Sequence, residues 1–84
     1  MKEIDYIVFS NSEILKFHRK IASKVKSLRM DRNLSQLDLA LAIGHKSMST
    51  IGKIEAGLES KHYNVEQLYK IAKVFEIDVS EIFI

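Results

Sequence analysis

"LSQLDLALAIGHKSMSTIGKIEAG", residues 34–57, contains two short helical patterns separated by a turn. Ser35 is suited to cap the first helix, "QLDLALAI", because its hydroxyl can accept from a backbone N–H of the first turn. Leu39 and Ile43 lie four residues apart in this segment, which is helical spacing. Gly44 can adopt the left-handed conformation that ends many helices. We therefore predict a helix over residues 36–43, with Ser35 as its N-cap.

The second pattern follows after a turn of about three residues, 44–46. Ser47 is expected to begin a helix and Gly57 to end it, with Ile51 and Ile54 at helical spacing between them. Two short helices joined by a turn that contains glycine predict a helix-turn-helix. The serines, threonine and glycine of this second helix are poor helix formers, so their presence requires a further reason.

Three further helical segments surround this pair. Residues 10–13, "SNSE", have the pattern of a capping box and open a long helix that should end near Arg32. Asn64 and Gln67 are spaced to cap the helix "VEQLYKIAKVFE", and Ser80 is expected to cap a last short turn. The long helix carries an apolar stripe at helical spacing: Ile14, Phe17, Ile21, Val25 and Leu28.

The sequence thus predicts an all-α fold of five helices. The segment "EIDYIVF", residues 3–9, is the one stretch that alternates like a strand. We expect a short N-terminal extension over residues 1–13 and one compact domain over residues 14–84. A chain of 84 residues is large enough for a single modest core.

The composition excludes several classes of protein. With 46% hydrophobic and 29% charged residues, the chain is neither disordered nor membrane-spanning. Its first residues are acidic where a signal peptide is basic, and it has no cysteine for disulfides or thiolate sites. We expect a cytoplasmic protein with no membrane partner.

The net charge of +2 is unevenly distributed. Residues 16–32 contain seven basic side chains and one acidic side chain, a local charge of +6. Residues 33–84 contain five basic and seven acidic ones. A basic segment of this kind suits a polyanionic partner, although a solvated helix face has the same composition.

The motifs "LSQLDLALAIG…S…TIGKIEAG" and "LYKIAKVFEIDVSEIF" resemble the lambda-repressor-like (Cro/repressor-type, xenobiotic-response-element) helix-turn-helix family. The resemblance covers about residues 20–83. It implies a sequence-specific regulator of transcription, in the manner of a repressor, that binds double-stranded DNA as a homodimer. It further implies a location on the DNA of a bacterium or phage. It also implies that helix 47–56 enters the major groove. Gly52 stands where the family more usually has a polar residue.

The face of helix 47–56 opposite its two isoleucines explains its composition. At 100° per residue, Ser49, Lys53 and Ala56 lie almost opposite the buried direction, Gly52 adjoins them and Met48 lies at the edge. Small side chains let a helix backbone approach bases and phosphates in a groove about 12 Å wide. Lys53 supplies a long donor suited to guanine O6 and N7.

The resemblance assigns roles to further residues. Arg29 and Glu55 match a structural ion pair between the first and third helices of the family. Gln36 matches a residue that touches the DNA backbone or supports the recognition helix. The loops on either side of that helix make phosphate contacts in the family, although Lys46, Lys61 and His62 could equally be solvated loop side chains. The complete set that we expect at DNA is Gln36, Lys46, Ser47, Met48, Ser49, Thr50, Gly52, Lys53, Lys61 and His62.

Two alternatives remain from other classes of protein. An enzyme such as a nuclease would use His18, His45 or His62, but these lie in different segments with no metal-ligand spacing, and no glycine-rich phosphate loop is present. We therefore expect no catalytic residue, metal or cofactor. The other alternative is an adaptor, or an antitoxin bound to its toxin, that keeps the fold but reads few bases.

Two segments are candidates for a dimer interface. Phe83 and Ile84 are apolar groups that a monomer would have difficulty burying, and residues 6–9 could pair or pack across a two-fold axis. Each segment could instead cover the core of its own chain. We expect both near the two-fold axis of a homodimer.

Overall fold

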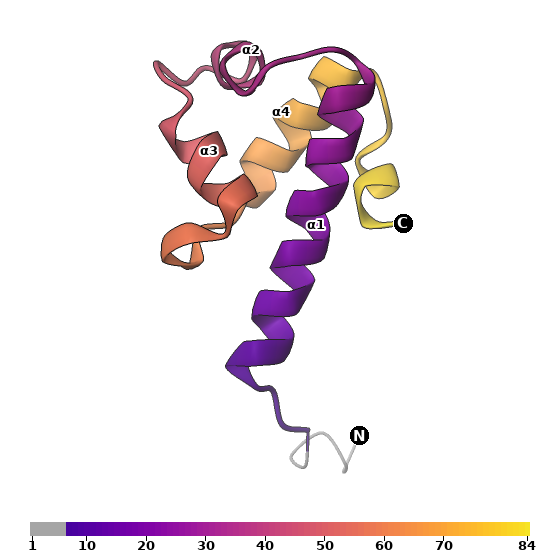
Figure 1. The fold of residues 1–84 in the computed structure, drawn as a ribbon. Coiled ribbons are helices and arrows are strands. Elements are labelled where there is room, and N and C mark those ends of the chain that lie inside the picture. Colours follow the sequence, from indigo (N-terminus) through magenta and orange to yellow (C-terminus); the bar gives the residue numbers. More distant parts are fainter. Residues whose placement is uncertain (1–6) are drawn as a thin grey trace.

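The structure, a computed structural model, describes residues 7–84 and contains, within that range, four α-helices, two 3-10 turns and no strand (Figure 1). The elements are α1 (Asn11–Asp31), α2 (Gln36–Ala42), α3 (Ser49–Ala56), η2 (Leu58–Ser60), α4 (Val65–Phe75) and η3 (Val79–Phe83). The prediction of an all-α fold is confirmed. The fifth helix is the short 3-10 turn η3 rather than an α-helix.

Side chains close the N-terminal ends of α1, α2 and α4 as the sequence predicts. The hydroxyl of Ser10 accepts from the backbone N–H of Glu13 at 3.1 Å. Ser35 and Asn64 each form a reciprocal capping box with the third residue of the following helix. These bonds satisfy backbone donors that a helix cannot satisfy itself.

The start of α3 differs from our prediction. The helix begins at Ser49, not at Ser47, and Met48 occupies the N-cap without a side-chain hydrogen bond. The Ser47 hydroxyl lies 3.1 Å from the Ser49 hydroxyl and accepts from the Ser49 backbone N–H at 3.4 Å. This local turn replaces the first turn of the expected helix, because short hydroxyl side chains compete for backbone donors.

Two expectations at the ends of the chain also need correction. Asp78, not Ser80, caps η3: its carboxylate accepts from the Ser80 N–H, and Glu81 completes the capping box. Residues 7–9, the last part of the expected strand, have no regular secondary structure, and the rest of that segment lies outside the described residues.

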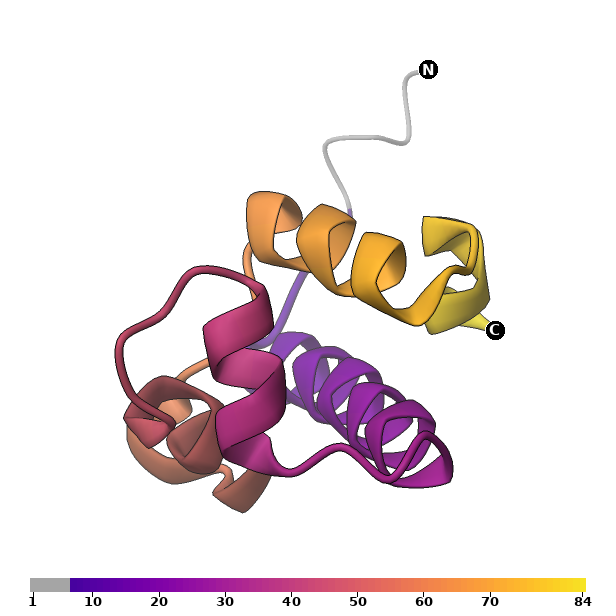
Figure 2. The ribbon, with the colours of Figure 1, turned by 90° about the horizontal axis from the view of Figure 1, so that it is seen from above.

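The core forms where α1, α2, α3, α4 and η3 meet. α2 packs on α3 and α4, while α1 packs on α3 and η3. In the view from above, α2 lies between α3 and α4 (Figure 2). The buried apolar residues are Ile21, Ala22, Val25, Leu39, Ala40, Ile43, Ile51, Ile54, Tyr63, Leu68, Ile71, Ala72, Phe75 and Ile82.

The N-terminal turns of α1 project beyond the other helices (Figure 1). The apolar stripe of α1 is therefore buried only in its C-terminal part. Ile21 and Val25 are buried and Leu28 is partly buried, whereas Ile14 and Phe17 are exposed. The stripe is longer than the core against which it packs.

Candidate nucleic-acid interface

The packing of α3 determines which of its faces is exposed to solvent. Ile51 and Ile54 are fully buried, so they anchor the helix against α1 and α2. On the opposite face, Ser49 and Ala56 are exposed, and Lys53 is partly exposed. The left-handed backbone of Gly57, with φ of 73°, ends the helix. The outward face of α3 thus consists of small side chains and one lysine.

Gln36 links the first turn of α2 to α3. Its side-chain amide donates to Glu55 Oε1 at 3.0 Å. Its own oxygen lies beside Gly52, where an added Cβ would be 3.4 Å away, an ordinary van der Waals contact. Gln36 therefore supports α3 from the side, and space alone does not require glycine at position 52.

Lys53 has a partner within the chain. Its ammonium nitrogen lies 3.0 Å from the Glu59 carboxylate, and both side chains remain exposed. Glu59 is held in a left-handed conformation, with φ of 57° and ψ of 25°. The Glu59 carboxylate was not predictable from the sequence, because the pair joins a helix to a turn whose shape depends on tertiary structure. This pairing compensates part of the Lys53 charge and uses one of the three N–H donors of its ammonium.

Arg19 fastens the C-terminal end of α3 to α1. Its guanidinium donates to the carbonyl oxygens of Ile54 at 2.6 Å and Glu55 at 3.1 Å. A positive charge is favourable at this end of a helix. A Cβ at Gly57 would lie 3.0 Å from the Arg19 guanidinium carbon, so glycine makes room for the contact. No sequence pattern within α1 predicts this role.

Arg29 and Glu55 form the ion pair that the resemblance implied. Arg29 Nε and Nη2 donate to the two Glu55 oxygens at 2.9 and 3.0 Å. Arg29 also donates to the Leu34 carbonyl oxygen at 2.6 Å, and the Glu55 side chain is only 2% exposed. With the Gln36 bond, this network joins α1, α2 and α3 through one buried carboxylate.

Tyr63 lies in the core near this network. Burial, followed by the negative charge of Glu55, raises the pKa of its phenol well above the usual range. Its hydroxyl has no hydrogen-bond partner among the described residues. The side chain is therefore neutral under all ordinary conditions and contributes mainly through its ring.

His62 turns toward α1 and stacks on His18, with ring centroids 3.8 Å apart and planes 14° apart. Burial, and secondly the charge of His62, lowers the pKa of His18 from its ordinary value. Thr50, Lys61 and His62 also line one polar hollow between the start of α3 and the loop before α4. The structure thus brings these three predicted residues together.

The remaining predicted residues lie around the start of α3. Lys46, Ser47 and Met48 are all exposed in the connection that follows α2. In the part of the chain that the structure describes, no three His, Asp or Glu side chains come together as metal ligands would. None of the helices in residues 7–84 is long and apolar enough to cross a lipid bilayer.

Two adjacent short helices, the second anchored by isoleucines and exposing a face of small residues, define a helix-turn-helix domain. The profile of a helix-turn-helix family matches residues 25–82, which is more than half of the chain. The chain belongs to the lambda-repressor-like helix-turn-helix family, a family of DNA-binding domains. A comparison with curated proteins gives no significant match.

Proposed function

We propose that this protein is a sequence-specific, repressor-like regulator of transcription that binds duplex DNA as a homodimer. α3 enters the major groove, and the N-terminal end of α2 lies over the DNA backbone. Recognition involves Gln36, Lys53 and Gly52, together with residues 46–48 of the connection, Ser49 and Thr50 at the start of α3, and the loop residues Lys61 and His62. The proposal places the protein on bacterial or phage DNA in the cytoplasm.

The observation that carries this proposal is the exposed face of α3. Ser49, Gly52 and Ala56 present almost no side-chain bulk, so the backbone of the helix can approach base edges closely. Lys53 is the charged side chain on this face, and its ammonium is suited to guanine O6 and N7. Because Arg19, Arg29 and Gln36 hold α3 from behind, the face is preorganised for binding.

Glu59 influences which DNA groups Lys53 can bind. Since Lys53 is paired with its carboxylate in the free protein, a DNA acceptor meets an ammonium whose charge is already partly compensated. A phosphate or base that does not align with Lys53 gains little from such an ammonium. The pair therefore favours discrimination between sites over general attraction to DNA.

A set of genomic fragments retained by the purified protein supplies the test duplex. Binding to this site should weaken steeply as salt increases, because counterions are released. Lys53→Ala should weaken binding to the selected site by about 5- to 150-fold and relax the preference at one base position. Lys70→Ala is the matched control, because Lys70 also has a carboxylate partner, Glu66 at 3.2 Å on α4, but lies outside the proposed interface.

Two results would contradict the proposal. An equal loss for selected and random duplexes would show that Lys53 contacts phosphate and does not read bases. The absence of both a preferred site and a salt dependence would instead identify an adaptor, or an antitoxin that acts through a protein partner.

A further inference from the structure

The projecting part of α1 exposes apolar side chains that no element of the described chain covers. Ile14 is 46% exposed and Phe17 is 52% exposed, although they continue the stripe that is buried at Ile21. Phe83 of η3 extends the same surface: its ring stacks on Phe17, with centroids 6.4 Å apart, and remains 44% exposed. The apolar surface therefore includes Phe83, one of the residues that we expected near a two-fold axis, and adds the exposed part of α1 to it.

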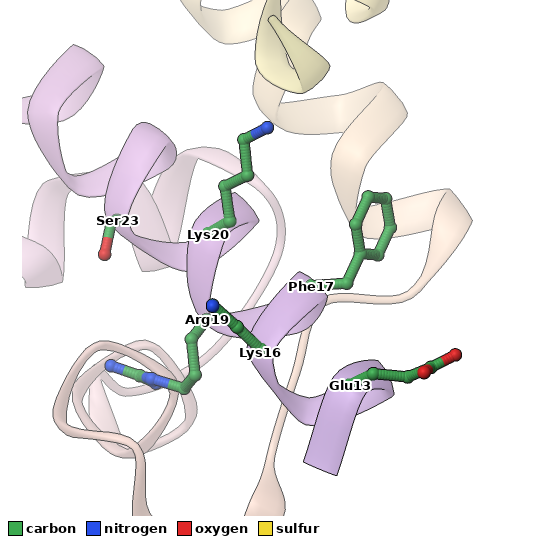
Figure 3. Close-up of a pocket in the computed structure, with 6 residues that line it drawn as sticks. All are labelled: Glu13, Lys16, Phe17, Arg19, Lys20 and Ser23. Atoms are coloured by element: carbon green, nitrogen blue, oxygen red, sulfur yellow. The ribbon is translucent and has the colours of Figure 1, made fainter. Parts of the chain in front are cut away.

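Charged side chains of both signs lie around Phe17 on this surface: Glu13 and Lys20, with Lys16 beside them. Glu13 lies four residues before Phe17, and Lys20 lies three residues after it. Both spacings place the charge on the same side of the helix as Phe17, about one turn away in either direction. Figure 3 shows Glu13 and Phe17 on one side of α1, while Arg19 points to the opposite side. Glu13 and Lys20 are exposed.

We propose that this surface is covered by the same surface of a second copy of the chain. The two α1 helices pack antiparallel, with the two-fold axis passing close to Phe17. That symmetry places each Glu13 opposite Lys20 of the partner subunit, once on each side of the axis. An isologous interface requires such self-complementarity, and a surface with charges of only one sign would repel itself.

The side of α1 opposite Phe17 lies outside the proposed dimer surface. Lys26 projects about 180° away from Phe17 on the helix and is exposed. Arg19, also turned away from Phe17, is occupied by the carbonyl oxygens at the end of α3. The dimer surface therefore leaves the contacts that hold α3 intact. This inference rests on the proposed function for its purpose, since two half-sites require two copies of α3.

Sedimentation of the full chain without DNA, across the micromolar range, tests the interface. The wild type should dimerise, and Glu13→Lys and Lys20→Glu should each weaken dimerisation by about tenfold or more, because two attractive pairs become repulsive. The double variant Glu13→Lys/Lys20→Glu restores both pairs and should recover dimerisation. Lys26→Glu, which makes the same change of charge outside the surface, should have no effect.

Several results would overturn this inference. They are a monomeric wild type, single variants that dimerise like the wild type, and a double variant that is no better than either single one. Circular dichroism should show equal helix content for all variants, because the substituted side chains are exposed. If one single variant loses helix, the comparison uses the other single variant, which reverses the same charge pairs. DNA titration tests the proposed function separately from the dimer interface, since a monomer can still bind a half-site through α3.

Discussion

Replacing Glu55 by glutamine tests the network that joins α1, α2 and α3. Glutamine keeps the size of the side chain but removes its charge. In the wild type, this carboxylate accepts two bonds from Arg29 and one from Gln36, and it is 2% exposed. After the replacement, the Arg29 guanidinium remains buried without a counterion. One of its two donors then faces the amide nitrogen of the glutamine, which is itself a donor and cannot accept the bond.

The expected loss follows from this burial. Breaking a buried ion pair typically costs about 3–5 kcal/mol. Arg29 keeps its bond to the Leu34 carbonyl, and the new amide oxygen can still accept one bond, so we expect the free energy of unfolding to fall by about 2–4 kcal/mol. A domain of this size has a total stability of about 4–13 kcal/mol. The Tm should therefore fall by about 10–25 °C.

Urea denaturation followed by circular dichroism measures the difference. A loss below about 1 kcal/mol, the range of solvent-exposed pairs, would refute the reasoning that burial makes this pair important. The double replacement of Arg29 and Glu55 by methionine is the control. It removes both charges and should cost less than Glu55→Gln alone. At a temperature where every variant is folded, DNA affinity should change much less than stability, because the Glu55 side chain points toward Arg29 and Gln36 and away from the exposed face of α3.

Three further predictions concern stability. Gly52→Ala should stabilise the fold by about 0.5–1 kcal/mol in urea denaturation, since alanine favours helix and its methyl meets only Gln36 at 3.4 Å. A loss of stability would show that Gln36 leaves too little space for the added methyl group. Tyr63→Phe should leave the Tm unchanged or raise it, because the buried hydroxyl has no partner, and a clear decrease would reveal a bond that the structure does not contain. Because the pKa of His18 is lowered, mainly by burial and secondly by His62, the unfolded chain binds this proton more readily than the folded chain. Stability should therefore be retained above the unfolded value of 6.5 and decrease as the pH falls from there toward the lower folded value, and His18→Gln should remove that part of the pH dependence in denaturation curves.

Helix ends were predictable from the sequence where the groups that form them lie close together in the chain. The capping boxes of α2 and α4 join residues three positions apart, so a short window contains the whole interaction. The start of α3 was not predictable in this way. Ser47 can cap a helix or form a local turn, and only the path of the connection from α2 decides between the two.

Contacts between distant residues were harder to predict. Periodicity shows that Ile14 and Phe17 belong to the apolar face of α1, but it does not show how far along that face the other helices extend. The bonds from Arg19 to the end of α3 span 35 and 36 residues of sequence, and nothing local marks them. The Arg29–Glu55 pair was expected only because the family resemblance supplied it. At the candidate site, the sequence predicted the small outward face of α3 but not the Glu59 carboxylate beside Lys53.

The contacts of α3 are unequal at its two ends, and this has a consequence for its motions. The C-terminal end is held by Arg19 and Glu55, whereas the N-terminal end lacks a side-chain cap. Local opening should therefore begin at Ser49 and stop at the buried Ile51 and Ile54, so amide hydrogens near the start exchange with solvent sooner than those near the end. The end of the helix nearest the turn can adjust to a bound surface without disturbing the core.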